Sequence, residues 1–294
     1  MVKVLLTRGL TAALAGLALA PAVANAGIFF PEKGGSQNAD KIWTLYLLIF
    51  ILAWIVFIGV AGALVWAMVK FRARKGMVAA QIHGNTRLEI GWTVGAGVIL
   101  IFITVFTFIT LPGIKNPPAS DIDANGNPVT ASNVLYASTD QPAPPKGSAS
   151  MNLRVDGQQY VWRYQYPKAD KAVFSYVDMV VPVGMTVTLD ITADDVAHSW
   201  WIPKLGGKMD AVPGYTNKTW FRIPTDAIPE GQDRVVFTGQ CAELCGRNHA
   251  NMYARVIGMR MPDYKKWYAD QVQALKTAKT DVAKQQKELQ AQQA

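Results

Sequence analysis

Residues 239–252 read Gly239-Gln240-Cys241-Ala242-Glu243-Leu244-Cys245-Gly246-Arg247-Asn248-His249-Ala250-Asn251-Met252. This segment has the spacing C-x3-C-x3-H-x2-M and holds both cysteines of the chain. Thiolate, imidazole and thioether groups together form a ligand set that prefers copper to hard cations. We therefore expect a loop between two strands that turns its soft side chains toward one point. His198, one of only three histidines, should reach the same point from elsewhere in the fold.

The region around both segments has the pattern of an all-β domain, which we place at residues 151–262. Short β-branched and aromatic runs occur at 160–166, 185–191 and 235–238. Turn sequences such as Val183-Gly184 and Pro213-Gly214 separate such runs. This alternation predicts an antiparallel sandwich or barrel.

Two segments of different composition flank this domain. Residues 113–150 are rich in Pro, Ser, Asn and Gly, which predicts a linker or long surface loop. Residues 263–294 are rich in Ala, Gln, Lys and Glu, with apolar residues spaced three or four apart at Tyr268, Val272, Leu275, Ala278 and Val282. That spacing predicts a polar C-terminal helix with one thin apolar stripe, for which we expect no chemical role.

Two long runs without a charged residue precede the linker, at 42–69 and 90–114. As helices they would be about 42 and 37 Å long, more than a hydrocarbon core of about 30 Å. We therefore predict a transmembrane hairpin within residues 27–112, with helices at about 42–69 and 90–112. The intervening loop carries a single acid, Glu89, and five basic residues: Lys70, Arg72, Arg74, Lys75 and Arg87. The positive-inside rule places this loop in the cytoplasm and the β domain outside.

The first 26 residues have the order of a secretory signal peptide. Lys3 and Arg8 precede an apolar run, which ends in Ala24-Asn25-Ala26. Cleavage is expected after Ala26, and a permanent N-terminal anchor is the alternative, although the run is short for a span. The signal implies a bacterial envelope, so we expect two helices in the inner membrane and the β domain on the periplasmic or outer side.

Composition excludes several classes of protein. Of the 294 residues 50% are hydrophobic and 17% charged, which excludes a disordered chain. The net charge of +8 comes without an Arg-rich helix or an aromatic RNA-binding pattern, so we expect no nucleic-acid partner.

The cysteine pair leaves several kinds of site open. One cysteine, two histidines and a weak methionine would make a mononuclear blue-copper site. Two thiolates could instead each bridge two copper ions, giving each metal two sulfurs and one imidazole. A disulfide between Cys241 and Cys245 is a third possibility, because exported cysteines oxidise readily. Structural zinc is a fourth, although the spacing lacks the usual short knuckles and methionine is not a favoured zinc ligand.

From about residue 40 to 261 the chain resembles subunit II of haem-copper cytochrome c oxidases. The resemblance lies in three segments: 195–200, Lys208-Met209-Asp210-Ala211-Val212-Pro213-Gly214, and the loop at 239–252. It implies an α+β membrane protein, in which the two-helix transmembrane hairpin is followed by a periplasmic all-β cupredoxin domain with a dinuclear CuA centre, and then by the C-terminal helix.

The resemblance also implies a ligand set. Cys241 and Cys245 would bridge the two coppers, with His198 and His249 as terminal ligands. Met252 would be a weak ligand to one copper and the backbone carbonyl of Glu243 a ligand to the other. The Glu243 side chain would reach a magnesium ion at the interface with the catalytic subunit.

Other positions bear on how electrons and protons would enter. Tyr160 replaces the family's customary surface tryptophan and is followed by Trp162, so we expect electrons to enter near this pair from cytochrome c or a similar redox donor. Asp194 and Asp195 would give a negative docking face or only turn hydrogen bonds. Glu89 resembles the family's proton-uptake entrance; an ordinary interfacial carboxylate is the alternative.

The function implied by the resemblance is that of the subunit through which electrons enter a proton-pumping terminal oxidase. Electrons from cytochrome c would pass through CuA to the haems of the catalytic subunit, which reduces oxygen to water. This chain would be a non-catalytic electron-transfer subunit of an oxidoreductase and translocase. Subunits I and III would be its partners in the lipid bilayer. Haems and the second copper site would belong to subunit I, because three histidines are too few to hold them here. The alternatives are a copper-free quinol oxidase subunit II and a membrane-anchored assembly module with a disulfide.

Overall fold

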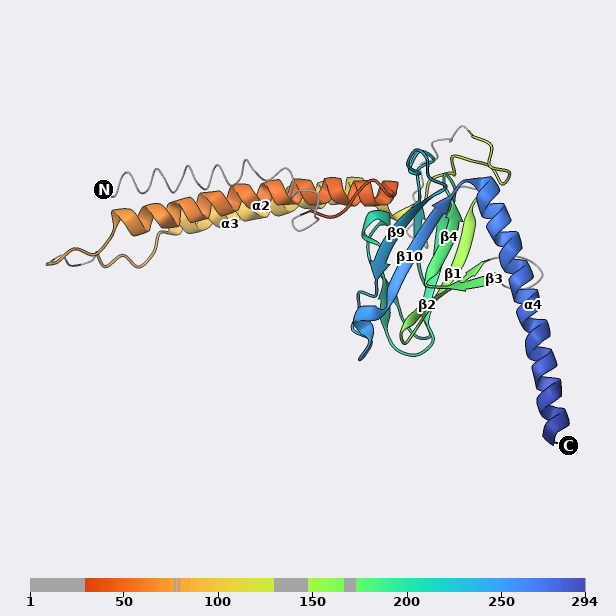
Figure 1. Ribbon diagram of the computed structural model, residues 1–294. Coiled ribbons are helices and arrows are strands. Elements are labelled where there is room, and N and C mark those ends of the chain that lie inside the picture. Colours follow the sequence, from red (N-terminus) through yellow and green to blue (C-terminus); the bar gives the residue numbers. More distant parts are fainter. Residues whose placement is uncertain (1–29, 77, 79, 130–147, 167–172, 294) are drawn as a thin grey trace. The chain divides into compact units, whose positions relative to one another are not determined.

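The computed structural model describes residues 30–76, 78, 80–129, 148–166 and 173–293 (Figure 1). The predicted signal peptide at 1–26 lies outside these residues. Within them, two long apolar helices are followed by a β-sheet domain and a C-terminal helix, which confirms the predicted fold class. The chain divides into two compact units, one with residues 43–103 and the other with residues 33–42 and 104–294.

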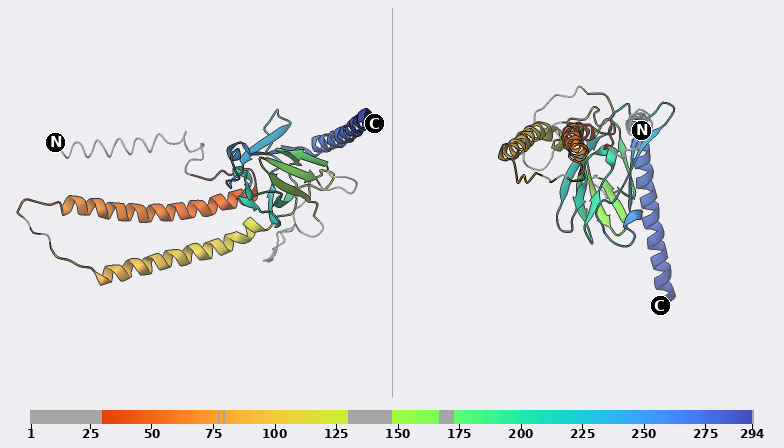
Figure 2. Two further views of the ribbon diagram at one scale, coloured as in Figure 1. Left: turned by 90° about the horizontal axis from the view of Figure 1, so that it is seen from below. Right: turned by 90° about the vertical axis from the view of Figure 1, so that its left-hand side faces the viewer.

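The helices are α2, Gln37–Lys70, and α3, Thr86–Lys115. Both are long and apolar enough to cross a membrane. Each extends beyond its predicted apolar run, because polar residues such as Asn38 and Thr86 form the first turns outside the apolar stretch. Figure 2 shows the two helices running antiparallel.

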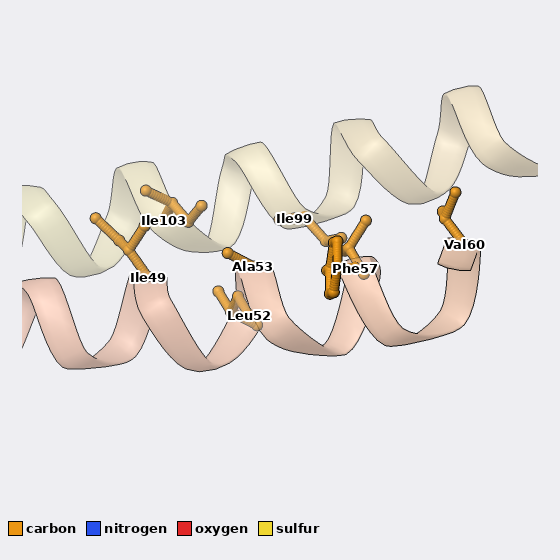
Figure 3. A pocket seen from close by; sticks show the side chains of 8 residues that line it. Ile49, Leu52, Ala53, Phe57, Val60, Ile99 and Ile103 are labelled. Carbon is orange, nitrogen blue, oxygen red and sulfur yellow. The ribbon is translucent and has the colours of Figure 1, made fainter. Parts of the chain in front are cut away.

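An apolar groove of about 520 Å³ lies between the two helices (Figure 3). It is lined by Ile49, Leu52, Ala53, Val56, Phe57, Val60, Ile99 and Ile103. Large apolar side chains on the rest of the helix surface are exposed, among them Ile55, Val69 and Ile109. A surface of this kind is stable only where lipid or protein covers it, because water would oppose its exposure.

The β domain holds ten strands within the described residues. They are β1 Met151–Gln158, β2 Val161–Tyr166, β3 Val173–Tyr176, β4 Asp178–Pro182, β5 Thr186–Ala193, β6 His198–Trp200, β7 Met209–Ala211, β8 Asn217–Arg222, β9 Arg234–Gln240 and β10 Tyr253–Met259. A five-stranded sheet has the order β3-β2-β1-β5-β8, a three-stranded sheet the order β4-β10-β9, and β6 pairs with β7. The core contains large buried side chains, such as Leu153, Trp162, Leu189 and Phe221.

The sequence predicted an antiparallel sandwich or barrel, but two of the strand pairs are parallel. β1 pairs with β5 in parallel, in a register that places Leu153 opposite Leu189, and β10 pairs with β4 in parallel. A parallel pair needs a long crossover between its strands. The chain from β2 to β4 supplies that crossover between β1 and β5, a long-range connection that strand patterns do not reveal.

The described part of the predicted linker packs against the β domain. The Ser120 hydroxyl accepts a hydrogen bond from Thr186 N at 2.8 Å and donates one to Ala149 O at 2.5 Å. Ile122 is buried in a small cluster with Met185 and Met261. Residues 118–122 are therefore part of the domain's packing, because their polar groups and one apolar side chain find partners there.

The C-terminal helix, α4, spans Met261–Gln293 and runs beside β3 and β4 (Figure 1). Its first half packs on the core through Tyr264, Trp267, Tyr268, Val272 and Leu275. The apolar stripe continues past this contact, but Val282 is 52% exposed.

β9 passes very close to the chain that leaves β6. A Cβ atom at Gly239 would lie 1.9 Å from Trp201 O and 2.8 Å from Ile202 Cα. Both are main-chain atoms, so no side-chain rotation could make room. The close approach allows Gln240 N–H to donate a hydrogen bond to Trp201 O at 3.1 Å. A glycine is therefore required where β9 meets the segment after β6.

Replacing Gly239 with alanine should push β9 away from Trp201 and lower the free energy of unfolding by about 3 kcal/mol or more, at the upper range for overpacked sites. Thermal unfolding of the intact protein in detergent would show this as a lower midpoint. Gly207→Ala is the matched control, because a Cβ there would meet only Ile42 Cδ1, at 3.8 Å. Equal midpoints for the two variants would contradict this account of the contact.

Candidate metal centre

Three of the candidate ligands lie close together in the β domain. The ligand atoms of His198, Cys241 and Cys245 all lie within 4.8 Å of one another, and all three residues are buried. His198 begins β6, and Cys241 directly follows β9. The structure thus brings together residues that are far apart in the sequence, as the soft-ligand pattern predicted.

The two cysteines are free thiols. Their Sγ atoms lie 4.0 Å apart, whereas a disulfide bond is about 2.05 Å long. This separation contradicts the disulfide alternative. It also leaves room for metal between the two sulfurs.

Each sulfur has its own imidazole and its own weaker donor. Cys241 Sγ lies 3.8 Å from His198 Nδ1 and 3.2 Å from Glu243 O. Cys245 Sγ lies 3.5 Å from His249 Nδ1 and 3.9 Å from Met252 Sδ. Atoms bound to one tetrahedral metal at 2.0 to 2.3 Å are separated by about 3.5 Å. The six donors therefore form two adjacent groups, one around each sulfur. The cluster of His198, Cys241 and Cys245 is consistent with a CuA site.

Main-chain hydrogen bonds hold the two ligand segments in place. Cys241 N donates to Met252 O at 2.9 Å, which closes the loop on itself. Ala242 N donates to Ser199 O at 2.9 Å, which joins the loop to β6 directly after His198. The loop geometry is therefore set by the backbone as well as by its ligands.

His198 is oriented by a carboxylate. Its side chain is fully buried, and its Nε2 lies 2.8 Å from Asp195 Oδ1. This contact leaves Nδ1 to face Cys241, in the manner of carboxylates that fix the orientation of metal-binding histidines. Burial alone would lower the pKa of His198, but its hydrogen bonds with Cys241 and Asp195 outweigh burial and raise it. The pKa of Asp195 is lowered, because hydrogen bonds from His198 and main-chain N–H groups outweigh the effect of its burial.

The thiols differ in their ease of ionisation. Burial opposes ionisation of both, but hydrogen bonds from His198 and neighbouring groups lower the pKa of Cys241. Burial and the nearby charge of Cys241 raise the pKa of Cys245. In the metal-free protein Cys241 is therefore the thiol that ionises first.

The two aromatic residues predicted for electron transfer, Tyr160 and Trp162, differ in their burial. Trp162 is fully buried, and its ring lies edge-on to His198 with centroids 5.8 Å apart. Tyr160 is half-buried, and its hydroxyl reaches Gly246, where a Cβ atom would lie 2.7 Å from Tyr160 Oη. Of the two residues, only Tyr160 can touch a partner at the surface.

Sequence reasoning missed Gln159. Its side-chain Nε2 donates a hydrogen bond to Cys245 O at 2.6 Å, and its main-chain N donates to Asp195 Oδ2 at 2.7 Å. The only signal in the sequence was its place next to Tyr160, because a glutamine is not a residue type that marks a metal centre.

Two predicted residues stand apart from this cluster. The Glu243 side chain is exposed, and only its carbonyl oxygen approaches Cys241. Glu89 lies in the first turn of α3, where its Oε1 accepts a hydrogen bond from Asn85 N at 3.3 Å. Asn85 Oδ1 in turn accepts one from Leu88 N at 3.2 Å. Glu89 therefore takes part in the helix cap, a role that the sequence analysis did not assign to it.

Comparison with known proteins follows the same division of the chain. Residues 23–110 match the model of the transmembrane domain of cytochrome c oxidase subunit II, and residues 176–258 match that of its periplasmic domain. Cytochrome c oxidase subunit 2 of Alkalihalophilus pseudofirmus is 32% identical over 232 residues, which are 78% of this chain and 58% of that protein. A probable cytochrome c oxidase subunit 2 of Rickettsia bellii is 32% identical over 229 residues, 71% of each chain.

A solved structure also resembles the chain over part of its length. It is the periplasmic domain of subunit II of the cytochrome oxidase of Bradyrhizobium japonicum, with 27% identity and a TM-score of 0.38. The match covers 43% of this chain and 96% of that domain. On the two domain matches and the Rickettsia relative, this chain belongs to the cytochrome c oxidase subunit II family, with both its transmembrane and its periplasmic domain.

Proposed function

We propose that this chain is the subunit through which electrons enter a proton-pumping terminal oxidase. It accepts electrons from cytochrome c at a dinuclear CuA centre and passes them to the haems of the catalytic subunit, which reduces oxygen to water. The observation that carries the proposal is the pairing of donors around two free sulfurs 4.0 Å apart. Each sulfur has one imidazole and one weaker donor of its own.

The donor set fits two copper ions better than one metal of another kind. Cys241 and Cys245 would hold both ions, with His198 and His249 as the terminal ligands. Met252 would be a weak ligand to one copper, and the Glu243 carbonyl a ligand to the other. Soft thiolate and thioether ligands favour copper over hard cations. A single tetrahedral zinc would leave Met252 and the Glu243 carbonyl without a purpose. When bound, the copper pair supplies one-electron transfer with its charge spread over two metals.

The protein's contribution is a rigid and dry site. His198 and both cysteines are buried, which keeps water away from them. The backbone bonds to Ser199 and Met252 hold the loop in one arrangement. Ligands that are held in place before an electron arrives need to move little when it does, which lowers the cost of the transfer.

The donor docks on the face that carries Tyr160. Tyr160 lies against Gly246, the residue after Cys245, so it offers a short route from the surface to a bridging sulfur. Asp194 and Asp195 are exposed beside it and give this face negative charge for a cationic cytochrome c. Trp162 takes part in electron transfer from inside the domain, where its ring lies edge-on to His198.

The remaining parts of the proposal rest on the family. Subunits I and III are the partners in the inner membrane, with the haems and the second copper site in subunit I. The Glu243 carboxylate would help to hold a magnesium ion at the interface with subunit I. A copper-free quinol oxidase subunit is disfavoured, because this chain retains every donor of the copper site.

Purified with its partner subunits, the protein should contain about two coppers per chain in this domain and give a mixed-valence copper signal. Cys245→Ser should abolish the signal, because it removes one bridging sulfur. Ala250→Ser, an exposed change in the same loop, should keep both coppers. Metal analysis with electron paramagnetic resonance checks this, and a native protein without copper would overturn the proposal.

Glu89→Gln should slow oxidase turnover severalfold while the copper signal stays intact. The substitution removes the ionisable group but keeps an oxygen that can accept the hydrogen bond from Asn85 N, so the start of α3 is preserved. Steady-state oxygen consumption measures the effect. Unchanged turnover would count against a role for Glu89 in proton uptake.

A further inference from the structure

Two adjacent glutamines, Gln158 at the end of β1 and Gln159 directly after it, have different partners. Gln158 Nε2 donates a hydrogen bond to Asp194 Oδ2 at 2.6 Å, and Asp194 is an exposed residue. Gln159 Nε2 donates instead to the carbonyl of Cys245, also at 2.6 Å. The Gln158 bond involves no candidate metal ligand, whereas the Gln159 bond is made to the candidate ligand Cys245.

Gln159 reaches the second ligand segment through its main chain. Its N–H donates to Asp195 Oδ2 at 2.7 Å, while Asp195 Oδ1 lies 2.8 Å from His198 Nε2. One residue thus contacts the loop that holds Cys245 and the carboxylate that orients His198.

The peptide after Cys245 needs this support. Gly246 has φ of +133°, a backbone conformation that is open to glycine and sparsely populated by other residues. The backbone there has little steric preference of its own, so external contacts decide where the Cys245 carbonyl points. A Cβ atom at Gly246 would lie 3.0 Å from Gln159 Nε2 and 2.7 Å from Tyr160 Oη, so these two side chains are the contacts at that point.

We propose that Gln159 is a positioning residue of the metal centre. Its amide fixes the Cys245–Gly246 peptide, and its main-chain N–H fixes Asp195, so that Cys245 and His198 keep a constant separation. The same contacts hold the neighbouring Tyr160 against Gly246. This inference rests on the proposed function, because it concerns the geometry around bound copper.

The side chain of Gln159 is exposed, so water can satisfy the Cys245 carbonyl when the amide is removed. Loss of the amide should therefore leave folding and copper content largely intact. What should change is the position of the Cys245 sulfur relative to the rest of the ligand set. The properties that report this position are the copper hyperfine pattern, the reduction potential and the rate of electron transfer from the donor.

The test uses the whole oxidase complex with three variants. Gln159→Leu removes the hydrogen-bond donor, and Gln159→Glu keeps the shape of the side chain but replaces the donor by an acceptor. Gln158→Leu is the matched control one residue earlier. We expect both Gln159 variants to bind copper with an altered hyperfine pattern, a shifted potential and slower oxidation of cytochrome c. The Gln158 variant should keep the native hyperfine pattern and potential.

Native hyperfine pattern and potential in either Gln159 variant would overturn the inference, because both variants lack the hydrogen-bond donor to the Cys245 carbonyl. Changes of the same size in Gln158→Leu would also overturn it, since they would show a general effect of altering the end of β1. Absence of copper from the native complex is a different result, and it would overturn the proposed function itself.

Discussion

The end of β9 and the segment that leaves β6 are joined through their main chains, and the candidate metal centre depends on that junction. Gln240 N bonds to Trp201 O and Ala242 N to Ser199 O, on either side of Cys241. Gly239 permits the approach because it has no side chain. Without this contact, His198 and Cys241 would belong to separate strands with no fixed distance between them.

The ligand set has an inner and an outer layer. The inner layer supplies sulfur and imidazole donors, and the outer layer holds them through Asp195 and Gln159. The outer groups are exposed while His198 and the cysteines are buried. This gradation suits the proposed electron-transfer function, because the buried donors are shielded from water while the groups that orient them lie at the surface.

Much of the candidate site could be predicted from sequence because its residue types are rare in this chain. Two cysteines and three histidines leave few ways to build a soft-ligand cluster. The close spacing of Cys241, Cys245 and His249 identifies most of the candidate ligands. The two long helices could also be predicted from the sequence, because uncharged apolar runs of that length are typical of membrane spans. The orienting role of the outer layer was not predicted. The sequence indicated Asp195 only as a docking or turn residue, and glutamine is not a residue type that marks a metal centre. The sequence also did not predict the parallel pairing of β1 with β5 or the packing of Ser120, because long-range contacts determine both.

The central claim is that two coppers share two sulfurs in this domain. Copper X-ray absorption of the purified complex, with the contribution of the catalytic subunit's copper subtracted, tests it most directly. The account predicts that each copper has two sulfur neighbours and one imidazole nitrogen, with a second copper close by. A single copper with one sulfur neighbour and no metal beside it would contradict the account.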